Sequence, residues 1–157
     1  MNKIALFADV QNIYYTTRQA YGRQFNYRKL WQNINVRGHI EVAIAYATDR
    51  GDEKQLRFQS ALKHIGFAVK LKPYIQRADG SAKGDWDVGI TIDVLEAARK
   101  VDTIVLLSGD GDFDLLLEKV KSKNQVTAEV YGVMELTAGS LIDSASFFHP
   151  IEPSLLI

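Results

Sequence analysis

Short apolar runs alternate with segments of helical length along the whole chain. The apolar runs predict strands because they are short and rich in branched side chains; they cover residues 3–8, 40–47, 67–75, 103–107 and 126–133, with a last short strand near Phe147 and Phe148. Apolar residues at helical spacing predict helices over residues 27–36, 52–65, 87–100, 112–123 and 139–144. This alternation predicts an α/β protein, a three-layer α/β/α sandwich around a mainly parallel sheet of five or six strands.

Local signals place several ends of these elements. Asn26 is a candidate N-cap for the helix over 27–36, and Gly66 is expected to end the helix over 52–65. Pro73 favours an edge position for its strand, because proline lacks the N–H that a central strand donates.

The chain has 157 residues, which fits one domain. We expect a single domain over residues 1–150 and a C-terminal tail over residues 151–157. The stretch beyond His149, which holds Pro150 and Pro153, is expected to be loosely held.

Composition is that of an ordinary globular protein, with 46% hydrophobic and 24% charged residues. The chain has no cysteine, which excludes disulfides, thiolate zinc sites and cysteine nucleophiles. The first apolar run is too short for a signal peptide, and no run approaches the roughly 18 residues of a membrane span. We therefore expect a cytoplasmic location and no membrane partner.

The formal net charge is zero, which counts mildly against a nucleic-acid partner. The charge is unevenly spread, because residues 67–83 hold four basic side chains and one acidic one. Basic surface can therefore lie beside a cluster of acids, although an ordinary solvated face explains the same pattern.

Polar and acidic residues follow the predicted strands. Asp9 and Asn12 follow the first strand, Asp49 ends the second, and residues 108–112, Ser-Gly-Asp-Gly-Asp, follow the strand over 103–107. The carboxyl ends of parallel strands meet at one edge of the sheet, where ligands bind. Each acid alone is explained by helix capping or a turn, but several acidic clusters at one edge repel one another and favour a hard divalent cation.

Other phosphate or calcium motifs do not fit the stretch over 108–112. No Gly-Lys-Ser/Thr follows it, and an EF-hand loop counted from Asp110 would place Leu115 and Lys121 where glycine and glutamate are needed. The G-x-G-x-x-G spacing of a dinucleotide site is also absent.

Three motifs together resemble a known family. Asp-Val-Gln-Asn over 9–12, Lys-Gly-Asp-Trp-Asp-Val over 83–88 and Ser-Gly-Asp-Gly-Asp-Phe over 108–113 look like the NYN domain of the PIN-like nuclease superfamily, and its LabA-like branch in particular. The resemblance covers roughly residues 3–150. It implies a PIN-like, Rossmann-like sandwich and a ribonuclease that uses Mg²⁺ or Mn²⁺.

The resemblance also implies roles for individual residues. It assigns metal binding and catalysis to four acids, Asp9, Asp87, Asp110 and Asp112. Asn12 would orient the substrate or a water held by the metal, and Ser108 would bind a phosphate or support Asp110. Lys83 and Arg77 could hold flanking phosphates. The implied reaction is hydrolysis of RNA by a metal-activated water.

The sequence indicates less specific roles for several neighbouring residues. Asp85 is expected to act as a helix cap, and Asp93 lies about 120° around the helix from Asp87, so a shared site is doubtful. Tyr14 and Tyr15 could stack on a base or simply pack. The three histidines show no ligand spacing.

Two other functions fit the same sequence. One is a non-catalytic module that binds RNA or a protein, and the other is a metal-dependent phosphatase acting on small esters. A homodimer through an exposed apolar helix face is also possible.

Overall fold

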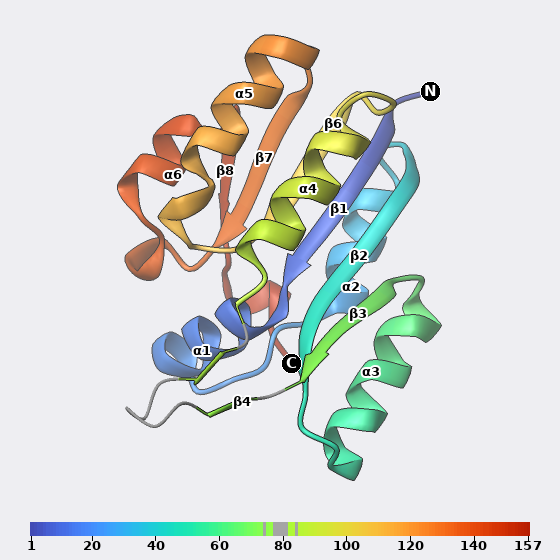
Figure 1. Ribbon diagram of the computed structural model, residues 1–157, viewed down its shortest axis with the longest axis vertical. Helices are drawn as coiled ribbons and strands as arrows, with labels where there is room; N and C mark the ends of the chain where they lie inside the picture. The colour runs from blue at the N-terminus through green and yellow to red at the C-terminus, as the bar shows by residue number, and fades with distance from the viewer. Residues whose placement is uncertain (74, 77–81, 84) are drawn as a thin grey trace.

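The computed structural model describes residues 1–73, 75–76, 82–83 and 85–157. A six-stranded, all-parallel sheet forms its centre (Figure 1). Its strands lie in the order β3 (Ala68–Pro73), β2 (His39–Asp49), β1 (Lys3–Asp9), β6 (Thr103–Leu107), β7 (Thr127–Gly132) and β8 (Phe147–Pro150). A separate antiparallel pair joins β4 (Ile75–Gln76) to β5 (Ala82–Lys83).

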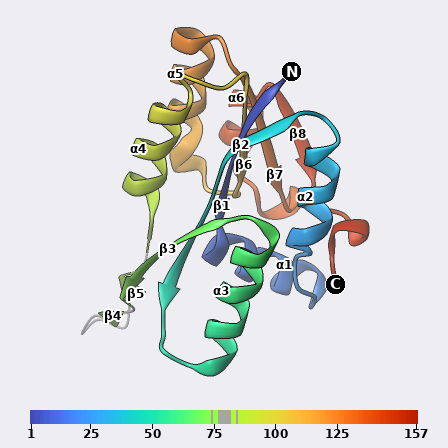
Figure 2. The ribbon, with the colours of Figure 1, turned by 90° about the vertical axis from the view of Figure 1, so that its right-hand side faces the viewer.

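Helices cover both faces of the sheet and make three layers. One face carries α1 (Val10–Tyr21), α2 (Tyr27–Asn35) and α3 (Glu53–Ile65), and the other carries α4 (Asp87–Ala97), α5 (Asp114–Asn124) and α6 (Gly139–Ser144). Figure 2 shows α4 and α5 on the side of the sheet opposite α2. The predicted PIN-like α/β/α sandwich is therefore confirmed.

Strand β1 shows why two layers of helices are needed. Ile4, Leu6 and Ala8 point into the core beneath α1, α2 and α3, whereas Ala5 and Phe7 point into the core beneath α4, α5 and α6. All five residues are fully buried, which accounts for the continuous apolar run in the sequence.

The predicted N-cap at Asn26 and the predicted helix end at Gly66 are confirmed, and Asp52 is a further N-cap that was not predicted. The Asn26 carboxamide accepts a hydrogen bond of 3.0 Å from the Lys29 backbone, and the Asp52 carboxylate accepts one of 2.7 Å from the Gln55 backbone. Gly66 ends α3 with φ +138°, a conformation that disfavours residues with a Cβ. Strand β3, which ends at Pro73, lies at the sheet edge as expected.

The expectation of a loosely held C-terminal stretch is wrong. Ile151, Leu155 and Leu156 are buried in the core beneath α1, α2 and α3. The Asn26 backbone donates to Leu155, and the Ile157 backbone donates to Gln24, both at 2.8 Å. Backbone pairing with a distant loop therefore holds this segment.

Two helix boundaries differ from the sequence prediction by more than one residue. A single 3-10 turn, Gly111–Phe113, precedes α5, so the α-helix begins two residues later than expected. Helix α4 ends at Ala97, three residues before the predicted end, and the chain turns there toward β6.

Candidate active site

The candidate site lies at the carboxyl ends of β1 and β6, which are neighbours in the middle of the sheet. The chain leaves β1 for helices on one face and leaves β6 for α5 on the other face. Such a change of direction opens a crevice beyond the strand ends, where open α/β sheets bind ligands. Asp9 closes β1, and Asp110 follows β6 by three residues.

Three of the four predicted ligands come together in this crevice. Carboxylate oxygens of Asp87, Asp110 and Asp112 all lie within 4.8 Å of one another. Asp87 and Asp110 are half-buried, and Asp112 is exposed. Oxygen donors at this spacing suit a hard divalent cation such as Mg²⁺ or Mn²⁺.

A local turn brings two of these acids together. The Asp112 backbone N–H donates to the Asp110 carboxylate at 2.9 Å, so Asp110 caps the 3-10 turn that carries Asp112. Gly111 fits this turn because a Cβ there would lie 2.8 Å from the Ala138 side chain. The Gly-Asp-Gly-Asp sequence thus serves both the turn and the cluster.

Asp9 lines the same cavity of about 300 Å³ as Asp87 and Asp110, but it lies outside the group of three. Its carboxylate accepts a hydrogen bond of 3.0 Å from the Ser108 hydroxyl. Ser108 in turn accepts one of 3.2 Å from the Asp110 backbone. Ser108 is fully buried, so of the two roles considered for it, the structure favours support of Asp110 over contact with a phosphate.

Asn12 connects the ends of β1 and β6 by a hydrogen bond. Its side-chain oxygen accepts a hydrogen bond of 2.9 Å from the Gly109 backbone. A Cβ at Gly109 would lie 2.9 Å from the Leu136 carbonyl, so the backbone here approaches its neighbours too closely for a larger residue. Asn12 therefore positions the loop that carries Asp110, and it also lines the acidic cavity.

Burial and mutual repulsion perturb two of the acids. Burial raises the pKa of Asp9 to about 6, an effect that hydrogen bonds from Ser108 and the Asn12 backbone partly offset and to which repulsion from Asp110 and Asp85 adds. Partial burial, followed by repulsion from Asp110, raises the pKa of Asp87 to about 8. A bound cation would favour the ionised form of both groups.

Trp86 positions the start of α4, a role that sequence reasoning missed. Its indole N–H donates to the Ala47 carbonyl at 2.9 Å, and its ring packs on Tyr46 at a centroid distance of 5.3 Å. A Cβ at Gly89 would lie 2.6 Å from this ring. The Trp86–Gly89 pair was a findable signal, because residues three apart share a helix face.

The remaining predicted residues lie in different places. Asp85 accepts a hydrogen bond of 2.8 Å from the Asp87 backbone, as expected of a cap, and also lines the acidic cavity. Asp93 lies outside the cluster and binds Tyr46 and Lys70. Asp49 accepts from the Gly51 backbone in a turn. The Lys83 side chain and all of Arg77 lie outside the described residues.

Two residues that sequence reasoning did not single out also line the acidic cavity. They are Gln11 and Thr16 of α1, which stand there beside Tyr15. Gln11 and Tyr15 are four residues apart and therefore share one face of the helix.

Comparison with known proteins agrees with this geometry. The NYN domain model matches residues 3–152, and the chain therefore belongs to the NYN domain family. A curated relative, the low amplitude and bright protein LabA of Synechococcus elongatus, is 32% identical over 130 residues, which cover 78% of this chain and 69% of the relative. A crystal structure of a protein of unknown function from Vibrio parahaemolyticus is 49% identical. It superposes with a TM-score of 0.94 over 99% of this chain and 96% of its own.

NYN domains are generally nuclease-like, and the chain has the fold and an acidic cluster that suit that class. Among the described residues, no helix has the length and apolar character needed to cross a membrane.

Proposed function

We propose that this protein is a metal-dependent ribonuclease that hydrolyses RNA phosphodiester bonds at the acidic crevice. The observation that carries the proposal is the approach of Asp87, Asp110 and Asp112 to within 4.8 Å at the switch point of an NYN-family sheet. Three carboxylates this close to one another repel one another, and a bound cation relieves that repulsion. A cation beside a phosphate also favours cleavage of a phosphodiester bond.

The three clustered acids would hold Mg²⁺ or Mn²⁺, and Asp9 would support them from the floor of the cavity. When bound, such a cation lowers the pKa of a water and stabilises the negative charge that develops on a phosphate. Burial and repulsion raise the pKa of Asp87 to about 8 without a metal, and a bound cation would favour the ionised form in which Asp87 serves as a ligand.

Other residues fix the geometry. Ser108 holds the Asp9 carboxylate and the Asp110 backbone, and Asn12 holds the Gly109 backbone, so the two strand ends keep a constant spacing. Trp86 fixes the first turn of α4 against β2 and therefore fixes Asp87. This rigid support is what catalysis by pre-positioned groups requires.

The test is cleavage of a labelled single-stranded RNA in Mn²⁺ or Mg²⁺ by wild type and by Asp110→Asn. We expect metal-dependent cutting by wild type and a loss of about a thousandfold in the variant, because a metal contributes several kcal/mol of transition-state stabilisation. Asp102→Asn is the matched control, because Asp102 is exposed at the opposite end of β6, where its carboxylate accepts a hydrogen bond from the Lys3 backbone.

Circular dichroism would show that all three proteins are folded. Wild type that binds RNA but never cuts it with either metal would replace the nuclease with the binding-module alternative. Failure both to bind and to cut RNA would shift the search to small phosphate esters.

A further inference from the structure

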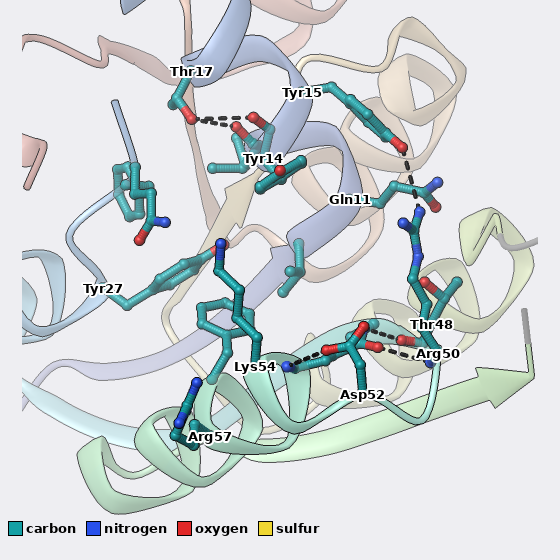
Figure 3. A pocket seen from close by; sticks show the side chains of 17 residues that line it. Gln11, Tyr14, Tyr15, Thr17, Tyr27, Thr48, Arg50, Asp52, Lys54 and Arg57 are labelled. Carbon is teal, nitrogen blue, oxygen red and sulfur yellow. Dashed lines mark hydrogen bonds between the residues drawn. The ribbon is translucent and has the colours of Figure 1, made fainter. Parts of the chain in front are cut away.

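A second cavity, of about 500 Å³, lies beside the acidic crevice and has the opposite character. It opens between α1 on one side and the β2–α3 turn and α3 on the other (Figure 3). Two residues of α1, Gln11 and Tyr15, line both cavities, so the two are adjacent.

The charges on this cavity favour an anion. Three cationic side chains line it, Arg50, Lys54 and Arg57, against one acid, Asp52. The Asp52 carboxylate is already engaged as the cap of α3, where it accepts from the Gln55 backbone. Lys54 and Arg57 are exposed and come from the same helix, and Figure 3 shows the Lys54 side chain directed from α3 toward α1.

The walls of the cavity are aromatic. Tyr14 and Tyr15 are 43% and 50% exposed on α1 and pack edge to face with each other at 5.4 Å. On the inner side, Tyr27 packs against Phe25 and Phe58 at centroid distances of 4.9 and 5.8 Å. Exposed rings beside cations are the combination that binds single-stranded nucleic acid, since bases stack on rings and phosphates pair with Lys and Arg.

Size and position agree with that chemistry. A volume of about 500 Å³ lies within the range of small-ligand sites and can hold a nucleotide. A strand whose phosphate lies in the acidic crevice would pass Gln11 and Tyr15 before it reaches the basic cavity. A base already paired and stacked in a duplex would not be free to enter.

We propose that this cavity is a nucleotide-binding subsite for single-stranded RNA, which holds a nucleotide next to the one at the acidic crevice. The inference rests on the proposed ribonuclease function and adds the place where a second nucleotide of the substrate binds. Lys54 and Arg57 bind flanking phosphates, and Tyr15 provides a stacking surface at the boundary between the two cavities.

The test separates binding from cleavage. Fluorescence anisotropy of a labelled uridine hexanucleotide is measured in Mg²⁺ with every protein carrying Asp110→Asn, so that RNA survives whether or not the parent protein cuts it. The double variant Lys54→Ala/Arg57→Ala should bind about tenfold or more weakly. Its salt dependence, the slope of log K against log salt, should fall by about 0.7 for each phosphate that the variant no longer neutralises.

The matched control is Lys119→Ala/Lys123→Ala, which removes the same charge from α5 on the opposite face of the sheet. Tyr15→Ala should weaken binding about tenfold, whereas Tyr15→Phe should keep it because the ring remains. Circular dichroism checks that each variant is folded.

Each outcome decides the inference separately from the nuclease proposal. Selective loss of binding at the basic cavity supports the subsite even if the wild type never cuts RNA. Equal loss in the α3 and α5 double variants, no RNA binding by the parent, or unchanged binding by Tyr15→Ala would overturn it.

Discussion

Two regions of this molecule surround their carboxylates in opposite ways. Glu129 of β7 is only 3% exposed, and Arg37 and His149 both contact its carboxylate, the latter at 2.7 Å. Asp87, Asp110 and Asp112 instead face one another, and the group as described contains no basic side chain. The same functional group is thus neutralised in one region and left in a like-charged cluster in the other.

The difference separates structural acids from acids that await a ligand. A buried charge costs stability unless it is paired, and the fold supplies the partners of Glu129 itself. Around the three aspartates, hydrogen bonds position the backbone but leave the mutual repulsion in place, as the raised pKa of Asp87 shows. A cation supplied from solution would complete the second region as Arg37 completes the first.

The largest expected effect comes from adding that cation. At Mn²⁺ or Mg²⁺ concentrations about 100 times the dissociation constant, the free energy of unfolding of the wild type should rise by about 2.7 kcal/mol. For a chain of this size that is an increase of about 5 to 10 °C in melting temperature. Calorimetry measures it, with Asp110→Asn expected to lose the response and Asp102→Asn to keep it. An equal shift in NaCl of matched ionic strength would contradict a specific site.

The next effect tests the paired carboxylate. Arg37→Ala removes a cation from Glu129 and should lower the free energy of unfolding by about 2 kcal/mol, less than for a fully buried pair because Arg37 is partly exposed. Urea unfolding measures the change. Arg99→Ala, which removes an exposed cation after α4, should change stability by less than about 0.5 kcal/mol. A similar loss of stability in both variants would show that the contact between Arg37 and Glu129 does not stabilise the fold more than an exposed cation does.

The smallest expected effect comes from Asp87→Asn, which should raise the free energy of unfolding whereas Arg37→Ala lowers it. The pKa of Asp87 is raised from 3.8 to about 8 in the folded protein, so the native state holds a proton that the unfolded state releases. Metal-free protein should therefore lose stability as pH rises from about 4 through about 8. Asp87→Asn should flatten this decline and stabilise the metal-free protein at pH 8 by about 1 kcal/mol, after screening by solvent.

Chelator-treated samples melted at a series of pH values would measure this decline. Asp102→Asn serves again as the control, because that carboxylate lies at the far end of the sheet. A decline as steep in Asp87→Asn as in the wild type would mean that the acids do not repel one another strongly enough to affect folding.

Much of the fold follows from the sequence because its central strands, β1, β6 and β7, are buried on both faces. Residues 103–107 and 139–144 form a strand and a helix with the predicted bounds. The periodicity gives no range for α1, because the buried face of this helix includes Thr17, a polar residue. Its hydroxyl is satisfied internally by a hydrogen bond of 2.7 Å to the Ile13 carbonyl, which a hydropathy pattern does not reveal.

The acidic cluster could be predicted for a different reason. Asp110 and Asp112 belong to one local turn, and the parallel topology places Asp87 at the same edge of the sheet. The basic cavity could not be predicted, because Arg50, Lys54 and Arg57 line the same cavity as Tyr14 and Tyr15 only in the folded arrangement of α1, the β2–α3 turn and α3. The burial of Leu155 and Leu156 likewise depends on a loop more than a hundred residues earlier in the chain.

The strand order has a consequence for how the protein is made. Strand β1 lies between β2 and β6, yet Thr103, which begins β6, comes about 95 residues after Asp9, which ends β1. At typical rates of translation the ribosome needs about 5 to 20 seconds to cover that distance. During this interval the very apolar β1 has one unpaired edge, which is the period in which a molecular chaperone would best protect the nascent chain.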